Sequence, residues 1–168
     1  IIDKDADLEY AAQRVLTGAF AYAGQVCISV QRVYIHQDVF AEFAELIASA
    51  AQQVQMGNPA LETTALGPMI DDRAVNRIDA WVSAAVEDGA RILTGGSSDG
   101  RFYRPTVIVD APRESAVCAR EAFAPIVNLF PFSEWSTALH QINDSVYGLQ
   151  AGVFTSNLEH ALMAFGSQ

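Results

Sequence analysis

Segments with helical spacing of apolar residues alternate with strand-like segments along this chain, and this alternation limits the fold more than any other feature of the sequence. Strand-like runs, rich in β-branched and aromatic residues, occupy residues 30–35, 91–94, 106–109, 126–132 and 149–155. Helical segments follow residues that can serve as N-caps, namely Asp5 or Asp7, Asp38, Asp71 or Asp72, Ser133, and Asn157. The alternation predicts one α/β domain over residues 1–168, a three-layer α/β/α arrangement with a mainly parallel sheet.

Glycine and proline indicate where these segments end. Gly24 is placed to end the first helix in a left-handed conformation. Gly57-Asn58-Pro59 is expected to end the second helix, and Gly89 the third. Residues 95–100 are rich in glycine and serine, which predicts an exposed turn.

Composition excludes several classes of partner. Ten basic and twenty acidic residues give a formal net charge of −10, which argues against nucleic acid and anionic membranes. No run reaches the roughly 18 apolar residues of a transmembrane helix. Two cysteines far apart in sequence indicate neither a disulfide framework nor a metal site, so a reducing, cytoplasmic setting is expected. The chain begins with Ile1 rather than Met, and we interpret it as a piece of a longer protein.

Cys27 is the first candidate for a functional side chain. It lies where the first helix gives way to a strand, and such connections often present functional groups. A buried structural cysteine is one interpretation, and a nucleophilic thiolate is the other. Backbone N–H groups in the glycine-containing turn could stabilise an oxyanion beside the sulfur. Spacing alone does not decide between the two.

Other motifs carry less information. Asp3-Lys4-Asp5-Ala6-Asp7 imitates the start of a calcium loop, but Leu8 and Arg14 stand where that loop needs Gly and Glu, so we attribute the run to the helix N-terminus. Residues 95–100 lack the Lys-Ser/Thr pair of a phosphate-binding loop. The three histidines are scattered, and Cys118 lacks a glycine-containing turn, so we assign no metal ligands and consider Cys118 structural. A lone Glu121 beside Arg120 is normally a solvated charge.

Five short motifs in order resemble those of the NAD(P)-dependent aldehyde dehydrogenases. They are Gly24-Gln25-Val26-Cys27 with Arg32, Leu66-Gly67-Pro68, Tyr103-Arg104-Pro105-Thr106-Val107, Glu121-Ala122-Phe123-Ala124-Pro125, and Asn143 with Tyr147-Gly148-Leu149. The resemblance implies the fold of that family's catalytic domain and makes Cys27 the nucleophile. It also implies that Glu121 holds the nicotinamide ribose and that Phe123 packs near the nicotinamide ring. Ala124 and Arg120 depart from the family, which more often has Gly and often an acid there.

The implied reaction is oxidation of an aldehyde to a carboxylic acid with NAD or NADP, through a thiohemiacetal and a thioester on Cys27. Residues 24–32 resemble members that act on small aldehydes, such as lactaldehyde-like or phosphorylated three-carbon substrates. The family's general base, oxyanion-binding Asn and cofactor-binding domain precede this region, so we expect the chain alone to be inactive. The full-length protein is expected to be a homo-oligomer.

Two alternatives remain open at this stage. The chain could be a non-catalytic α/β module that keeps this fold and serves in assembly. It could also be a thiol hydrolase that uses Cys27 with a histidine, although no histidine lies near Cys27 in sequence.

Overall fold

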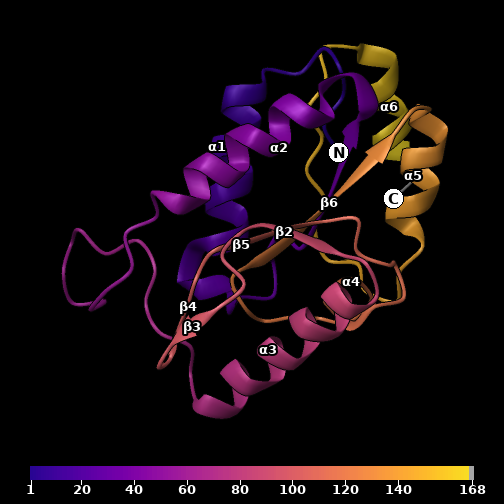
Figure 1. Cartoon of the computed structure of the whole chain (residues 1–168). Coiled ribbons are helices and arrows are strands. Elements are labelled where there is room, and N and C mark those ends of the chain that lie inside the picture. Colours follow the sequence, from indigo (N-terminus) through magenta and orange to yellow (C-terminus); the bar gives the residue numbers. More distant parts are fainter. Residues whose placement is uncertain (167–168) are drawn as a thin grey trace.

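A four-stranded sheet lies at the centre of the protein (Figure 1). A computed structural model describes residues 1–166. The strand order is β1 (Arg32–His36), β6 (Ile126–Phe132), β5 (Thr106–Val109) and β2 (Arg91–Thr94). β6 pairs in parallel with both β1 and β5, whereas β2 joins the edge of β5 antiparallel. The mainly parallel sheet is therefore confirmed.

Helices cover both faces of this sheet. On one face α2 (Gln37–Gln52) contacts all four strands and α1 (Leu8–Phe20) packs beside it. On the other face α3 (Asp72–Glu87) packs on the short α4 (Ala116–Ala119), which contacts β6 (Figure 1). α5 (Trp135–Asn143) also contacts β6, and α6 (Leu158–Gly166) follows near the end of the chain. The three-layer α/β/α prediction is confirmed.

The strands of the sheet centre are buried along almost their whole length. Every residue of β5 is buried, and in β6 only Pro131 is exposed. Continuous apolar runs are typical of strands covered on both faces, which is why these segments do not alternate between apolar and polar residues. From α2, Phe43 and Ile47 fill the space above the sheet and are fully buried.

Three predicted N-caps are confirmed by their hydrogen bonds. The side chain of Asp7 accepts from the N–H of Tyr10, and Asp71 accepts from the N–H of Ala74. Asn157 accepts from the first turn of α6. These bonds satisfy donors that a helix N-terminus otherwise leaves free.

Two other predicted caps are wrong. β1 runs into α2 without a loop, so His36 precedes the helix and Asp38 lies inside its first turn, donating its N–H to the ring of His36. Glu134, and not Ser133, precedes α5, and it makes no capping bond. The second helix also ends at Gln52, before the predicted glycine-proline stop, and the chain continues as a projecting segment.

Two loop predictions need correction as well. Only Phe154 of residues 149–155 forms a bridge, to Ile2, and a single pair is too short to make the predicted strand. Residues 95–100 are more than an exposed turn, because β3 (Ser98–Asp99) pairs there with β4 (Phe102–Tyr103). A β-carbon at Gly95 would lie 2.2 Å from the carbonyl oxygen of Pro105, so this glycine sits in a close backbone contact.

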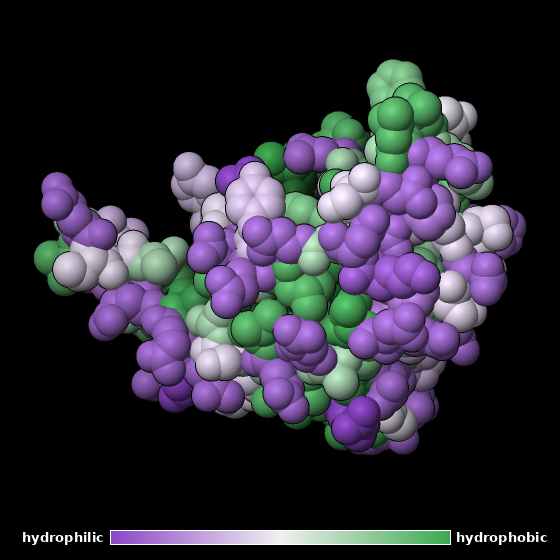
Figure 2. Space-filling model, turned by 90° about the horizontal axis from the view of Figure 1, so that it is seen from above, coloured by the Kyte–Doolittle hydropathy of each residue, from purple (hydrophilic) through white to green (hydrophobic). Residues whose placement is uncertain are grey.

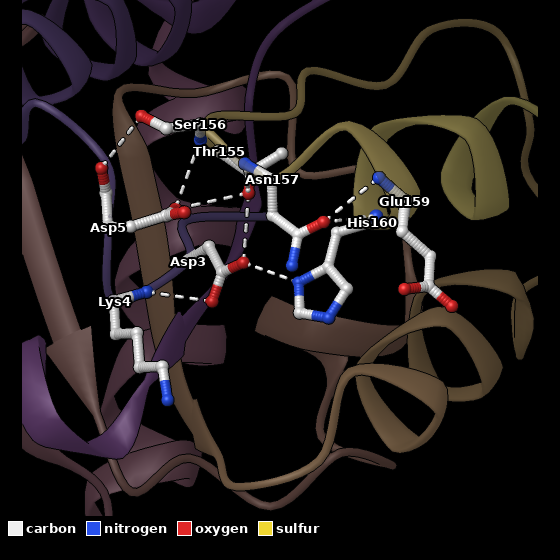
Figure 3. A network of polar contacts seen from close by, with 8 residues as sticks. All are labelled: Asp3, Lys4, Asp5, Thr155, Ser156, Asn157, Glu159 and His160. Carbon is white, nitrogen blue, oxygen red and sulfur yellow. Dashed lines mark hydrogen bonds and ion pairs between the residues drawn. The ribbon is translucent and has the colours of Figure 1, made fainter.

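The two ends of the described chain meet through a buried carboxylate (Figure 3). Asp3 is 2% exposed; its oxygens accept from the N–H of Lys4 and the hydroxyl of Thr155, and Oδ2 lies 2.6 Å from Nδ1 of His160. The ring of His160 stacks on Trp135. Burial raises the pKa of Asp3, but these hydrogen bonds together outweigh it and leave the pKa below its usual value. Asp5 likewise accepts from Thr155 and Ser156, so of the three acidic residues in this run only Asp7 accepts a hydrogen bond from the helix N-terminus.

The segment between α2 and α3 projects from the body, at the left of Figure 1, and Figure 2 shows it projecting at the same side in a view from above. Its base is closed by backbone hydrogen bonds from Gly57 to Leu66 and from Ala65 to Gln55. Elsewhere on the face in Figure 2, hydrophilic residues cover most of the surface and apolar residues are exposed between them. Within residues 1–166, no helix is long and apolar enough to cross a membrane.

Candidate active site

The chain before Cys27 has an unusual backbone conformation. Tyr22, Ala23 and Gly24, which form the short 3₁₀ segment η1 (Ala21–Gly24) with Ala21, all have positive φ angles, of 54°, 55° and 66°. Left-handed conformations are costly for residues with a β-carbon, so this run is strained and has to be held by its surroundings. Gly24 is left-handed as predicted, but it does not end the first helix, because α1 stops earlier, at Phe20.

Cys27 follows in a tight turn. The N–H of Ser29 donates to the carbonyl oxygen of Val26 over 3.0 Å, which closes a turn around Cys27. The hydroxyl of Ser29 also donates to the carbonyl of Ala19, near the end of α1. Cys27 itself is exposed, so its thiol is open to reagents and substrates. The structure therefore does not place Cys27 in the core.

Gly24 joins the Cys27 turn to the segment that carries Glu121. A β-carbon at Gly24 would lie 2.1 Å from the carbonyl oxygen of Ala124 and 2.9 Å from the nitrogen of Pro125. Only a glycine permits two backbones to approach this closely. Two motifs that are far apart in sequence are thus in direct backbone contact.

Gln25 joins the same turn to the base of the projecting segment. Its side-chain oxygen accepts from the N–H of Ile70 over 2.8 Å, and its side-chain nitrogen donates to the carbonyl of Pro68 over 3.3 Å. The Leu66-Gly67-Pro68 motif singled out in the sequence is therefore tied to Gln25, two residues before Cys27.

Glu121 and Phe123 lie between α4 and β6, and both are exposed. Phe123 has a φ of 49°, a second strained position at this site. The residue is 39% exposed, which is unusual for a phenylalanine and makes it accessible to a ligand.

One cavity of about 660 Å³ brings the predicted residues together. Cys27, Glu121 and Phe123 all line it, and so does Tyr147 of the last sequence motif. A volume of this size suits a small-molecule site. Cys27 precedes β1 and Glu121 precedes β6, and the parallel pairing of these two strands brings both residues to the same end of the sheet. This proximity depends on tertiary pairing, so the spacing of residues in the sequence could not show it.

The two cysteines differ in environment. Cys118 is 6% exposed, and burial raises the pKa of its thiol, partly offset by a hydrogen bond from Ser115. A buried thiol with a raised pKa is a poor nucleophile. The exposed Cys27 is the thiol of the two that a reactant in the cavity can reach.

Two residues that sequence reasoning did not single out hold the Glu121 segment. The side chain of Gln31 hydrogen-bonds to backbone groups on both sides of Glu121, and Arg77 of α3 donates to the carbonyl of Ala122 over 2.6 Å. A single glutamine or arginine has no distinguishing sequence pattern, so no local signal could have found them. Among residues 1–166, no cluster of three or more His, Cys, Asp or Glu side chains could hold a metal ion.

Comparison with known proteins identifies the family of this site. The sequence profile described as the aldehyde dehydrogenase family matches residues 1–167. This chain belongs to the aldehyde dehydrogenase family. The motif resemblance noted in the sequence is therefore confirmed.

Curated aldehyde dehydrogenases share substantial sequence with the chain. It is 43% identical over 164 residues to the 3-sulfolactaldehyde dehydrogenase of Priestia aryabhattai, covering 98% of this chain and 34% of that protein. It is 36% identical over 168 residues to the lactaldehyde dehydrogenase of Escherichia coli (strain K12), covering 98% of this chain and 35% of that protein. The chain thus spans about a third of the length of these relatives.

Solved aldehyde dehydrogenase structures superimpose closely. Aldehyde dehydrogenase 21 from Physcomitrella patens, in complex with the reaction product succinate, has a TM-score of 0.95 at 42% identity, covering 99% of this chain and 35% of its own. The glyceraldehyde-3-phosphate dehydrogenase GapN from Methanocaldococcus jannaschii, complexed with NADP, has a TM-score of 0.94 at 31% identity, covering 99% and 36%. The predicted fold class of the aldehyde dehydrogenase catalytic domain is confirmed.

Proposed function

We propose that the whole protein that carries this chain oxidises a small aldehyde to its carboxylic acid, with NAD⁺ or NADP⁺ as the oxidant and Cys27 as the nucleophile. The observation that supports this most directly is that Cys27, Glu121 and Phe123 line one cavity. Their segments are locked together by the contact of Gly24 with Ala124.

The residues around the cavity fit a nicotinamide cofactor. Glu121 offers an exposed carboxylate that can accept hydrogen bonds from paired ribose hydroxyls. Phe123 offers an exposed aromatic face that can limit the motion of the nicotinamide ring. When bound, the oxidised nicotinamide supplies the acceptor for a hydride.

Cys27 carries the covalent chemistry in this proposal. Its thiolate adds to the carbonyl carbon, so a C–S bond forms and the carbonyl oxygen becomes negatively charged. Loss of hydride from the same carbon leaves a thioester on the sulfur. Water then cleaves the C–S bond, releases the acid and restores the thiolate. The exposure of Cys27 in its turn allows aldehyde and water to reach the sulfur.

The substrate we propose is a short aldehyde that carries a hydroxyl or an anionic group. Two relatives, 43% and 36% identical to this chain, are named for 3-sulfolactaldehyde and lactaldehyde. Arg14, Arg32 and Arg120 also line the cavity, and their charges suit an anionic tail.

Two variants of the whole protein test the proposal. Cys27→Ser should lower the rate of NAD(P)H formation from lactaldehyde by about 1,000-fold or more, as expected for loss of a nucleophile. Cys118→Ser is the matched control, because it removes the buried thiol and should keep most of the activity. A Cys27→Ser enzyme within tenfold of the unmodified rate would refute the role of Cys27.

We also propose that the 168-residue chain alone turns over no aldehyde, because the family's general base lies outside it. Purified chain and whole protein can be compared in the same assay at equal concentration, and equal rates would contradict this. For the whole protein we further propose a homo-oligomer in a reducing cytoplasm, which suits two unpaired cysteines.

The thiol hydrolase alternative is weakened by the positions of the histidines. His36 is buried in β1, and none of His36, His140 and His160, all within the described residues, lines the cavity with Cys27. The non-catalytic module is separated from the enzyme by the same Cys27→Ser assay.

A further inference from the structure

The side-chain amide of Gln31 spans the backbone around Glu121. Its nitrogen donates to the carbonyl oxygens of Arg120 over 2.6 Å and Val117 over 2.8 Å. Its oxygen accepts from the N–H of Ala122 over 2.9 Å. Both polar ends of one amide are thus bonded to the peptide groups that flank Glu121 on either side.

Gln31 is itself held firmly at the edge of the sheet. It lies four residues after Cys27 and directly before β1. Its carbonyl accepts from the backbone N–H of Asn128 over 2.8 Å and from the side chain of Asn128 over 3.2 Å. The buried Asn128 belongs to β6, so the base of the Gln31 side chain is fixed to the central strand.

This bonding explains how the strained Phe123 persists. A left-handed residue with a side chain is retained only where its neighbours are over-determined. Ala122, the residue before it, has its N–H bonded to Gln31 and its carbonyl bonded to Arg77 over 2.6 Å. On the other side, Ala124 is fixed by its contact with Gly24.

We propose that Gln31 is a positioning residue, which fixes the backbone of residues 120–122 so that Glu121 and Phe123 face the nicotinamide end of the cofactor. The inference rests on the proposed function, because it assigns that segment to cofactor binding. Gln31 lines the same cavity as Cys27, but all the hydrogen bonds of its side-chain amide go to backbone groups of residues 117–122, so in this role it acts through that segment. It couples the strand that follows Cys27 to the cofactor-binding segment.

Gln31→Met in the whole protein removes the amide and keeps the length of the side chain. The KM for NAD(P)⁺ should rise about tenfold, the effect of losing one to two hydrogen bonds, while the KM for the aldehyde stays within about twofold. Thr106→Val is the control for general destabilisation. It removes two hydrogen bonds of the Thr106 hydroxyl, which accepts from the N–H of Gly96 and donates to the carbonyl of Arg104. An unchanged cofactor KM in Gln31→Met, or an equal rise in Thr106→Val, would overturn the inference.

Gln31→Glu should weaken cofactor binding in a way that depends on pH, which a simple packing defect would not do. The carboxylate keeps an acceptor for Ala122 but opposes the carbonyl oxygens of Val117 and Arg120. Protonation of the introduced carboxyl group restores a donor. The dissociation constant for NAD(P)H, followed by its fluorescence, should therefore approach that of the unmodified protein as pH falls from 8 to 5, whereas Gln31→Met shows no such recovery. If the ratio of the dissociation constant of Gln31→Glu to that of the unmodified protein stayed the same from pH 8 to pH 5, the role of the amide would be contradicted.

Amide hydrogen exchange separates failure of this inference from failure of the proposed function. In Gln31→Met the Ala122 amide should exchange at least about tenfold faster, with β6 amides unchanged. If the unmodified whole protein oxidised no aldehyde, the proposed function would fall, and the exchange rates would still decide whether Gln31 fixes this segment. Equal exchange at Ala122 would overturn the positioning role whatever the activity.

Discussion

Gly24 and Ala124 are in backbone contact, so close that a β-carbon on Gly24 would lie 2.1 Å from the carbonyl oxygen of Ala124. The contact unites the turn that presents Cys27 with the segment that presents Glu121 and Phe123. The atoms of Ala124 nearest to Gly24 are its carbonyl carbon and oxygen, so the contact is made by backbone atoms that any residue at position 124 would supply.

Gly24→Ala should therefore destabilise the protein strongly. The added methyl group meets backbone atoms that cannot rotate away, and the φ of 66° is unfavourable for alanine. We expect a loss of about 3 kcal/mol or more in the free energy of unfolding, measured by urea denaturation. Gly100→Ala is the matched control: its φ is 56° and nothing lies within 4 Å of the added carbon, so only the backbone strain of about 1–2 kcal/mol should remain. Similar losses for the two variants would show that the contact is not tight.

The two thiols should differ in reactivity. With iodoacetamide at pH 7, Cys27 should be alkylated at least about tenfold faster than Cys118, because Cys118 is buried and its burial raises the pKa of the thiol. Mass spectrometry of peptides gives both rates in one sample. In 6 M urea the two rates should converge, which checks that the difference comes from folding. Equal, slow labelling of the folded protein would favour the non-catalytic module.

Asp3→Asn should weaken the junction between the chain's two ends. The buried carboxylate accepts several hydrogen bonds, and we expect its loss to cost about 1–3 kcal/mol at pH 7. Asp5→Asn is the control, since the exposed Asp5 bonds Thr155 and Ser156 at the surface and should matter less. Urea unfolding of the three proteins gives the comparison.

The same junction predicts a pH dependence. The pKa of Asp3 is lower in the folded protein than the unfolded value of about 3.9, so the ionised carboxylate stabilises the fold above that value. This contribution is lost as the pH falls through the folded pKa. The difference in unfolding free energy between the unmodified protein and Asp3→Asn should therefore narrow from pH 5 downwards. A difference that stayed constant down to pH 2 would contradict a lowered pKa.

Ile47→Ala tests the packing of α2 on the sheet. Ile47 is fully buried, so its truncation leaves a cavity and should cost about 2–5 kcal/mol in unfolding free energy. Leu162→Ala is the control, because Leu162 on α6 is exposed and its loss should change stability by about 0.5 kcal/mol or less. Thermal unfolding followed by circular dichroism separates the two. A small effect at Ile47 would mean that α2 is loosely packed.

Short sequence patterns correctly predicted those helices and strands that are determined by residues close together in the chain. Asp7, Asp71 and Asn157 cap helices because their short side chains reach the first turn, and the apolar runs at 106–109 and 126–132 form the buried strands. Capping ability does not fix where a helix begins when a strand leads straight into it. Asp38 was misplaced for that reason, because β1 continues directly into α2 at Gln37.

The candidate site was only partly within reach of sequence reasoning. Cys27, Glu121 and Phe123 were singled out by motif, and their shared cavity is a consequence of tertiary pairing that no spacing reveals. Gln31 and the buried Asp3 act through partners far away in sequence, so their neighbours in the chain say nothing about them. Residues 149–155 have strand-like composition, but their pairing is limited to Phe154 with Ile2.

The bridge between Ile2 and Phe154 also has a consequence for how the protein is made. Asp3 and Thr155, which flank it, are 152 positions apart, and at about 5–20 residues per second a ribosome needs roughly 8–30 seconds to supply the later partner. During that interval Ile2 can already pair with Ile35 of β1, but Asp3 lacks Thr155 and His160, which will enclose its carboxylate. Closing so long a loop is also entropically costly. The carboxylate of Asp3 should therefore be among the last groups of this segment to be enclosed in the newborn chain.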